Sequence, residues 1–249
     1  MKLNTLNKNK ILKNINPERL NIAIYNSLGS TNDECKSLTY ANDFNIVLAE
    51  EQTKGKGRMG KDWSSPLGNI YMSIAFSGSK FNEPLSLITG LICQEAINQV
   101  IGEDTVGLKW PNDIILNNKK VGGILCESEI KNNIINSFII GVGLNVNETV
   151  NDFPKELQDK ATSLFIETNN SFQRELISAI ITTFLERSIQ NFDSIMDEWL
   201  SFCAHLDKKV TFHYRNKELS GLFKGINSEG HAQIETKGKV LQFPSIYLK

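Results

Sequence analysis

The sequence predicts an α/β chain in which a mixed β-sheet backed by helices is followed by a small antiparallel β-barrel. Apolar segments of strand character alternate with helical segments as far as about residue 206. After residue 206, short strands are separated by turn residues, which is typical of a small barrel or sandwich. A chain of 249 residues can form one large domain and one small one. We therefore expect an N-terminal extension (1–21), a large domain (22–206) and a small C-terminal domain (207–249).

The first half of the chain contains three predicted strands and two predicted helices. Strands are expected at 22–27, 45–50 and 69–76, because short apolar or alternating runs occupy these positions. Ser30 or Thr31 is expected to cap a helix that runs to about Tyr40, since Asp33 and Glu34 suit the positive end of a helix dipole. Apolar residues at helical spacing predict a second helix over 84–102.

The second half returns to β-structure before two more helices. Strands are expected at 107–110, 113–116, 120–130 and 134–146. Asn117 and Asn118 predict a tight hairpin turn, because Asn tolerates a positive φ. Helices are expected at 172–191 and 193–203, and turns of the small domain at 215–217, 227–230 and 237–238.

The composition argues against several classes of protein. Lys and Arg number 27 and Asp and Glu 28, whereas nucleic-acid-binding proteins usually carry a basic excess. The cysteines (Cys35, Cys93, Cys126 and Cys203) are far apart, which indicates reduced, buried thiols instead of disulfides or a zinc site. The N-terminus lacks the apolar core of a signal peptide, and no apolar run reaches the roughly 20 residues that span a membrane. We expect a cytoplasmic protein that binds neither DNA nor membranes.

Residues 53–61 form a basic loop rich in glycine, Thr-Lys-Gly-Lys-Gly-Arg-Met-Gly-Lys. Its letters match the Gly-x-Gly-x-x-Gly of dinucleotide-binding proteins and nearly match a P-loop, but both motifs require a helix to follow. Pro66 and Gly68 argue against a helix, and Asp62 replaces the Ser or Thr of a P-loop and the small apolar residue of a protein-kinase loop. What remains is a set of backbone amides and cations suited to an anion, with a solvated surface turn as the alternative.

Three further segments place glycine, Asn and charged residues between apolar strands. They are Lys-Trp-Pro-Asn-Asp at 109–113, Lys-Val-Gly-Gly-Ile-Leu-Cys-Glu at 120–127 and Gly-Val-Gly-Leu-Asn-Val-Asn at 141–147. Glycine inside a strand often marks the close approach of a ligand, with a β-bulge as the alternative. Pro-Asn-Asp is equally good turn chemistry.

In this order the segments resemble the biotin–protein ligases. The family pattern is Ser-Thr-Asn, Gln, a Gly-Arg-Gly-Arg-x-Gly-x-x-Trp loop, Lys-Trp-Pro-Asn-Asp, Lys-x-x-Gly-Ile-Leu-x-Glu and Gly-x-Gly-x-Asn. It is matched at 30–32, 52, 55–63, 109–113, 120–127 and 141–147, and the resemblance covers about residue 22 to the end. Lys56 departs from the family's Arg, which keeps the charge but loses bidentate geometry. Some relatives carry an N-terminal helix-turn-helix domain; residues 1–21 are too few for one, so we expect the ligase-only type.

The resemblance implies a class II synthetase-like fold, shared by biotin and lipoate ligases, followed by a Src-homology-3-like barrel. It implies a biotin–[acetyl-CoA-carboxylase] ligase that uses ATP and Mg²⁺ to form biotinyl-5′-adenylate and then biotinylates a lysine of a biotin carboxyl carrier protein. Family members can form homodimers. Two alternatives stay open, a lipoate or octanoate ligase or transferase of the same fold and a non-catalytic biotin-binding module.

The resemblance also implies roles for individual residues. Lys120 and Arg58 are the implied catalytic cations, and Asp113 is the implied ligand of Mg²⁺ or acceptor of the lysine proton. Trp63 could cover the adenylate and Asn145 could read the adenine, while Lys249 matches a family position for a cation near ATP. Contacts with biotin or its adenylate are implied for Ser30, Thr31, Asn32, Gln52, Gly55, Lys56, Gly57, Arg58, Trp63, Lys120, Gly123 and Asn145.

Each implied role has an ordinary structural alternative. Ser30 and Thr31 could simply cap a helix, and Gln52 could be a surface residue. Trp63 could pack within its loop. Asp113 and Asn145 could belong to turns at the ends of strands.

Overall fold

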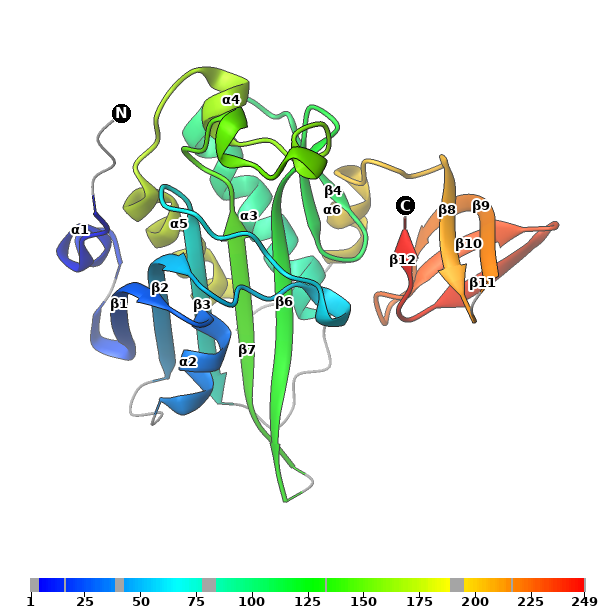
Figure 1. Ribbon diagram of the computed structural model, residues 1–249. Helices are drawn as coiled ribbons and strands as arrows, with labels where there is room; N and C mark the ends of the chain where they lie inside the picture. Colours follow the sequence, from blue (N-terminus) through cyan, green and yellow to red (C-terminus); the bar gives the residue numbers. More distant parts are fainter. Residues whose placement is uncertain are drawn as a thin grey trace.

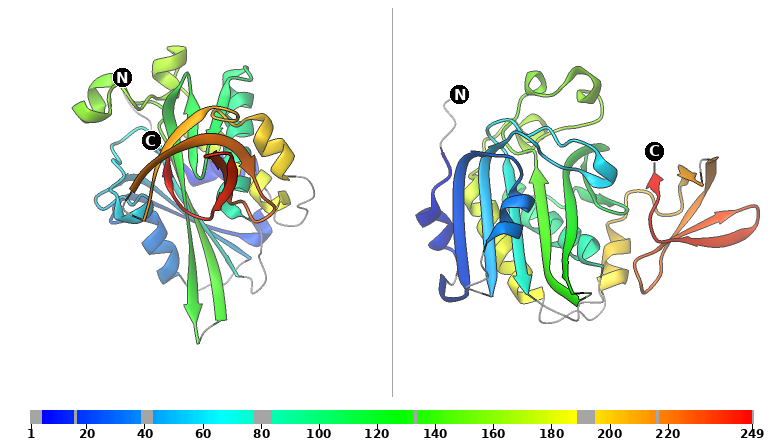
Figure 2. Two further views of the ribbon diagram at one scale, coloured as in Figure 1. Left: turned by 90° about the vertical axis from the view of Figure 1, so that its right-hand side faces the viewer. Right: turned by 60° about the horizontal axis from the view of Figure 1, so that its bottom comes forward.

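Two β-sheets organise the computed structural model, which describes residues 5–15, 17–38, 43–77, 84–132, 134–188, 195–215 and 217–248. The large sheet has seven strands in the order β1-β2-β3-β7-β6-β5-β4, and the small sheet has five in the order β11-β10-β9-β8-β12 (Figure 1). The two sheets lie side by side, with the small one at the far end from α1 (Figure 2). The predicted α/β class, a mixed sheet backed by helices with a second antiparallel sheet, is confirmed.

The large sheet is mixed because β1 and β2 run parallel while every other neighbouring pair is antiparallel. The turn between β5 and β6 consists of Asn117 and Asn118, whose φ angles are 49° and 63°, as the two asparagines predict. The strands at the predicted positions are β1 (Leu20–Leu28), β2 (Phe44–Gln52), β3 (Ile70–Ser77), β4 (Val106–Lys109), β5 (Asp113–Leu116), β6 (Lys119–Lys131) and β7 (Ile134–Leu144).

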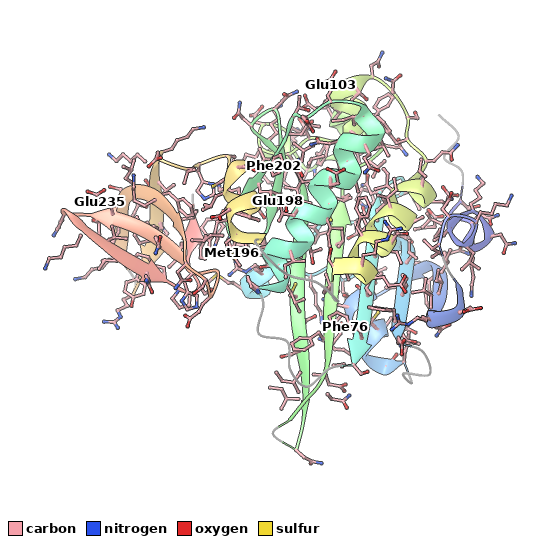
Figure 3. The ribbon with its side chains drawn as sticks, turned by 180° about the vertical axis from the view of Figure 1, so that it is seen from behind. Phe76, Glu103, Met196, Glu198, Phe202 and Glu235 are labelled. Carbon is pink, nitrogen blue, oxygen red and sulfur yellow. The ribbon has the colours of Figure 1, made fainter. Side chains whose placement is uncertain are left out.

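The described helices are α1 (Lys8–Leu12), α2 (Thr31–Ser37), α3 (Leu85–Ile101), α4 (Leu164–Thr168), α5 (Arg174–Ser188) and α6 (Ile195–Ser201). Helices α3 and α5 cross the back of the large sheet, and α6, marked by Met196, lies between α3 and the small sheet (Figure 3). Helix α2 lies on the opposite face (Figure 1). None of the helices within the described ranges is long and apolar enough to cross a membrane.

Helix boundaries differ from the predicted ones mainly at C-terminal ends. Helix α2 ends at Ser37, earlier than the predicted end near residue 40, and residues 39–42 lie outside the described ranges. Residues 189–194 are likewise outside, so the predicted end of the fifth helix near residue 191 is not described. Helix α3 ends where Gly102 takes a left-handed φ of 75°, the usual way to terminate a helix.

The alternation of residues along the strands gives the large sheet two unlike faces. On β3 the apolar side chains of Met72 and Ile74 are buried in the main core on the α3–α5 side, while Ser73 faces α2. On β7 the same core receives Ile140 and Val142. Successive side chains of a strand point to opposite faces, so Gly141 and its neighbours in the odd positions face α2. The back of the sheet therefore holds the main core, whereas the front holds a small apolar cluster beneath α2 and is otherwise left for smaller and polar groups.

The small sheet comprises β8 (Lys209–Tyr214), β9 (Lys217–Ile226), β10 (Ala232–Thr236), β11 (Lys239–Phe243) and β12 (Tyr247–Leu248), all antiparallel. Its turns lie at the predicted positions; Lys237 and Gly238, for example, have φ angles of 51° and 73°. Its strands curve strongly around a core that includes Phe212 and Phe223 (Figure 2). The division of the chain into domains at residue 206 stays a prediction.

Hydrogen bonds join β4 and the residue that follows it to the segment before β8 and to the turn between β9 and β10. The Leu108 N–H donates to Phe202 O (2.8 Å), and the Ala204 N–H donates to Leu108 O (2.9 Å). The buried indole N–H of Trp110 donates to Gly230 O (2.9 Å). The two sheets thus meet along β4 and the segment that follows it.

Candidate active site

A cavity of about 920 Å³ lies on the α2 side of the large sheet and extends to the small sheet. Apart from Gly55, and from Lys249, which the structure does not describe, the residues that the sequence predicts for the site line this cavity. They are Ser30, Thr31, Asn32, Gln52, Lys56, Gly57, Arg58, Trp63, Asp113, Lys120, Gly123 and Asn145. Gly55 lies just beneath it, where a β-carbon would stand 2.5 Å from Ser65 Oγ and 3.2 Å from Gln52 Nε2. The fold therefore gathers segments that are up to 115 residues apart in sequence.

The first turn of α2 and the end of β2 build a polar corner of the cavity. Gln52 Oε1 accepts hydrogen bonds from the Thr31 N–H (2.8 Å) and the Thr31 hydroxyl (3.1 Å), while Gln52 Nε2 donates to Ser65 Oγ (3.0 Å). Gln52 is therefore not a surface residue. Ser30 occupies the N-cap position of α2, but its side chain makes no capping hydrogen bond, so the capping alternative is wrong for Ser30.

A second layer of hydrogen bonds holds this corner in place. Ser73 Oγ lies 2.7 Å from Thr31 Oγ1 and 2.6 Å from Asn32 Oδ1. Asn32 Nδ2 donates to Glu127 Oε2 (2.7 Å), which in turn pairs with Lys36 across a distance of 2.7 Å. Ser73 and Glu127 come from β3 and β6. Sequence reasoning missed Ser73, because a lone Ser within an alternating strand has no distinguishing pattern.

The basic loop forms a compact turn and not the start of a helix. Lys56 and Asp62 pair as a β-bridge, the Gly57 N–H donates to Lys61 O (2.6 Å), and the Trp63 N–H donates to Gly55 O (2.9 Å). At its tip, Arg58–Gly60 form a short 3₁₀ turn in which Met59 and Gly60 have φ angles of 56° and 72°. The absence of a helix after this loop agrees with rejecting the dinucleotide-binding and P-loop interpretations.

The indole ring of Trp63 rests on two glycines that face each other across β6 and β7. Gly123 and Gly143 are direct partners in the β6–β7 register. A β-carbon on Gly143 would stand 2.7 Å from the indole ring, and one on Gly123 would stand 3.0 Å from it. A real β-carbon does not approach so closely, so these glycines provide a flat floor for the ring. The close approach that glycine within a strand predicts is thus made here by Trp63.

Two cations converge beside this floor. Lys120 Nζ lies 2.6 Å from Asp113 Oδ1 and 5.0 Å from the centroid of the Trp63 ring. The Arg58 guanidinium donates to Asn112 Oδ1 (3.3 Å) and to Ser245 Oγ (3.0 Å). Burial lowers the pKa of Arg58, while nearby Asp113 raises it; an arginine remains charged in either case. The turn after β4, which includes a cis Trp110–Pro111 peptide, places Asn112 and Asp113 for these contacts.

Lys56, which stands where the family pattern has Arg, takes a different position. Its Nζ pairs with Asp33 at the start of α2, with a closest N–O distance of 2.6 Å. Both side chains are nearly half exposed, so the pair contributes little to the free energy of folding, on the order of 0–1 kcal/mol. It does tie the basic loop to α2. Lys56 therefore carries less free positive charge into the cavity than Arg58, which donates to the neutral side chains of Asn112 and Ser245.

Residues 145–162 close the cavity on the side away from α2. Asn145 Nδ2 donates to Thr162 O (2.9 Å), and the Thr162 N–H donates to Lys120 O (2.9 Å). The first contact gives Asn145 a structural role, and its role in reading adenine stays a prediction. Phe153 and Leu157 line this side as apolar groups. Sequence reasoning missed both, because the segment carries no strand or helix periodicity.

Glu148 is a further cavity residue that the sequence did not reveal. It is 3% exposed, and within the described part of the chain its Oε2 has no hydrogen-bond partner. Burial raises the pKa of Glu148 to about 7, although the neighbouring Asn69 amide counteracts the shift. The sequence position of Glu148 could have indicated a site residue, since Glu148 directly follows the Gly-x-Gly-x-Asn-x-Asn segment. An acidic residue there also suits an ordinary turn.

The binding of Mg²⁺ by Asp113 stays a prediction. Within the described ranges, no group of three or more His, Cys, Asp or Glu side chains could hold a metal ion. A magnesium ion that arrives with a nucleotide needs few protein ligands, because phosphates and water complete its octahedron. One carboxylate such as Asp113 is compatible with that arrangement. Lys249 lies outside the described residues.

Comparisons with known proteins find similarity to biotin and lipoate ligases. Residues 25–145 match the biotin/lipoate A/B protein ligase family. The chain is 34% identical over 200 residues to the bifunctional ligase/repressor BirA of Bacillus subtilis, a match that covers 77% of this chain and 61% of that protein. It is 29% identical over 196 residues to the biotin–[acetyl-CoA-carboxylase] ligase of Paracoccus denitrificans, covering 74% and 81%. The chain thus spans less than two thirds of the Bacillus protein.

Solved structures of biotin protein ligases have the same fold. One is the Aquifex aeolicus protein in complex with biotin and ATP, which matches with a TM-score of 0.77 and 27% identity over 92% of this chain and 98% of that one. Another is the Leishmania major protein in complex with biotinyl-5-AMP, with a TM-score of 0.66 and 26% identity over 90% and 99%.

Proposed function

Because residues 25–145 belong to the biotin/lipoate A/B protein ligase family, we propose that this chain activates biotin with ATP and transfers it to a lysine of an acceptor protein. The observation that carries the proposal is the convergence of Arg58 and Lys120 beside the Trp63–glycine floor, in the same cavity as the polar corner of α2. Similar solved structures that contain biotin with ATP, or biotinyl-5-AMP, support this choice of substrates.

The polar corner suits the ureido ring of biotin. A ureido group needs a hydrogen-bond donor for its carbonyl oxygen and acceptors for its two N–H groups. The hydroxyls of Ser30 and Thr31 can serve either purpose, and Gln52 fixes Thr31 through two hydrogen bonds. We assign the ring to this corner and the valeryl chain to the space beside Trp63. The carboxylate then points toward Arg58 and Lys120.

The first step joins a biotin carboxylate oxygen to the α-phosphorus of ATP and releases pyrophosphate. In this step Arg58, Lys120 and the loop amides stabilise the negative charge on the reacting oxygens. Before ATP binds, Lys120 forms an ion pair with Asp113. A phosphate oxygen of ATP must therefore compete with the Asp113 carboxylate for Lys120. Mg²⁺ bound to ATP would neutralise part of the phosphate charge, and Asp113 is the residue that we propose to face it.

The second step is attack by the neutral amine of the acceptor lysine on the acyl carbon, which releases AMP. The floor and the loop keep the activated carboxyl group away from bulk water until the amine arrives. We propose a biotin carboxyl carrier protein as the acceptor. An additional role in DNA binding is not part of the proposal, and the homodimer stays a prediction.

Mass spectrometry tests the proposed function directly. The purified chain is incubated with biotin, Mg-ATP and a biotin carrier domain, and the carrier is expected to gain the mass of one biotin. A carrier with Arg in place of its acceptor lysine is the matched control and should gain nothing. Parallel reactions with lipoate and octanoate separate the related ligases. Release of pyrophosphate that depends on lipoate and not on biotin would overturn the assignment of substrate.

A further inference from the structure

The last residues of the small sheet alternate between buried and exposed positions. Ile246 and Leu248 are each 3% exposed and belong to the main core, whereas Ser245 and Tyr247 point outward. Strand β12 pairs with β8, with Tyr247 opposite His213, so the direction of these side chains is fixed by backbone pairing. Residues 246–248 also line the cavity.

The two outward side chains meet the basic loop on either side of its tip. The Arg58 guanidinium donates to Ser245 Oγ (3.0 Å), and Lys61 Nζ stands 3.6 Å above the centroid of the Tyr247 ring. The loop tip between them has little support of its own, since Met59 is 74% exposed. The loop is therefore held to the small sheet at two points that flank Met59 and Gly60.

These contacts can hold the loop because the small sheet cannot shift freely. Trp110 donates to Gly230 O from a buried position, and a β-carbon at Gly230 would stand 2.7 Å from Pro84, which shows how tightly the two parts pack. Because the small sheet is fixed in this way, side-chain contacts with it restrict the movement of the loop. Contacts between two mobile segments would not have this effect.

We propose that Ser245 and Tyr247 are positioning residues that hold the basic loop over the cavity before any ligand binds. A loop with three glycines loses considerable backbone entropy when it orders, so a fraction of free molecules would otherwise have it open. Apparent affinity falls in proportion to that fraction. The kinetic consequence rests on the proposed function: loosening the loop raises the KM for biotin and leaves kcat nearly unchanged, because the contacts are made equally before and during reaction.

Substitution of Tyr247 tests the proposal in the full-length chain without ligand. Tyr247→Leu removes the aromatic face, Tyr247→Phe keeps it, and both preserve an apolar group. Tyr214→Leu is the control, because Tyr214 is an exposed tyrosine of the same sheet whose ring contacts Phe243 and Arg215 instead of the loop. Hydrogen exchange of residues 54–63 should be about two- to fivefold faster in Tyr247→Leu, the factor expected from an exposed cation–π contact, and unchanged in the other two.

Lys61→Met removes the same contact from the loop side and should speed exchange to a similar degree. Unchanged exchange in both Tyr247→Leu and Lys61→Met would overturn the proposal. Faster exchange in Tyr214→Leu as well would also overturn it, since the effect would then come from general loosening of the small sheet. If the exchange results hold but no biotin is transferred by the wild-type chain, the loop contacts stand and the proposed function fails.

Discussion

The two faces of the large sheet use the same strands for opposite purposes. On the back, Met72 and Val142 are buried against a core completed by α3, and neither side chain is more than 3% exposed. On the front, the intervening residues Gly141 and Gly143 have no side chain, and the space goes to Asn32 and Trp63. Apolar burial on one face supplies the free energy that keeps the other face open and polar.

One buried ion pair on the back contrasts with one buried carboxyl group in the cavity. On the back, Arg174 on α5 pairs with Glu50 at 2.7 Å and also donates to Asn69 O (3.2 Å), while Glu50 accepts a further hydrogen bond from the Leu6 N–H. In the cavity, Glu148 is equally buried but has an oxygen without a described partner. A satisfied ion pair suits a structural role, whereas an unsatisfied carboxyl group is typical of a site that awaits a ligand. Three experiments test whether residues on the back of the sheet serve stability while residues in the cavity serve ligand binding.

The largest effect is expected at Lys120, on the cavity side. Lys120→Ala should lower the rate of adenylate formation by about 100- to 1000-fold, because one preorganised cation at the developing negative charge is lost. The fold should survive, since the Lys120 side chain is 33% exposed. Pyrophosphate release from biotin and ATP measures the rate. Lys119→Ala is the control, because the neighbouring Lys119 does not line the cavity. A near-normal rate in Lys120→Ala would remove this residue from the mechanism.

Gly122 on β6 and Gly143 on β7 face opposite sides of the sheet, so substitutions at these positions test the two faces separately. Gly143→Ala places a methyl group against the Trp63 ring and should weaken biotin binding about tenfold or more with little loss of stability. Gly122→Ala instead collides with Leu144 on the back and should lower the free energy of unfolding by about 1–3 kcal/mol. Calorimetry of biotin binding and urea unfolding measure the two effects. Equal losses of affinity and stability in both variants would show that the faces are not separate.

The pH dependence of unfolding tests the unsatisfied carboxyl group. The pKa of Glu148 is raised to about 7 from an ordinary value of 4.5, so the folded chain binds more protons than the unfolded chain between these pH values. Stability from this group is therefore full below pH 4.5 and is lost as the pH rises through 7, by up to about 3 kcal/mol. Glu148→Gln should match the wild type at pH 5 and exceed it at pH 8 in urea unfolding. Glu156→Gln, at an exposed site, should show no such difference.

Sequence patterns predicted the strands of the large sheet well, because strand positions depend on the local alternation of apolar and polar residues. The glycines within those strands likewise indicated a close approach of another group. The strand positions and the Asn117–Asn118 turn followed from short segments, whereas the grouping of the motif residues around one cavity followed from the family resemblance. The contacts of Ser245 and Tyr247 with the basic loop could not be predicted, since they join residues almost 190 positions apart through exposed side chains with no periodic signal. The burial of Glu148 was hidden for the same reason, because it depends on how residues 145–162 fold over the cavity.

The choice of partner for each cation also escaped prediction. Lys56 and Lys120 look equivalent in sequence, yet Lys56 pairs with Asp33 outside the floor, and Lys120 pairs with Asp113 beside it. Which carboxylate a lysine meets depends on how α2 and the turn after β4 are placed, and local sequence does not encode that placement. Charge alone therefore identified segments that line the cavity, whereas the ranking of Lys120 above Lys56 came from the family resemblance.

The position of Trp63 gives the protein a built-in optical reporter. The chain has three tryptophans; Trp199 is 1% exposed and does not line the cavity, whereas Trp110 is 2% exposed and lines it together with Trp63. Because Trp110 is already buried, a molecule that fills the space beside the partly exposed Trp63 changes the polarity mainly around the Trp63 indole. Emission spectra of the unlabelled protein can therefore follow the filling of the cavity in real time, and Trp63→Phe supplies the silent reference.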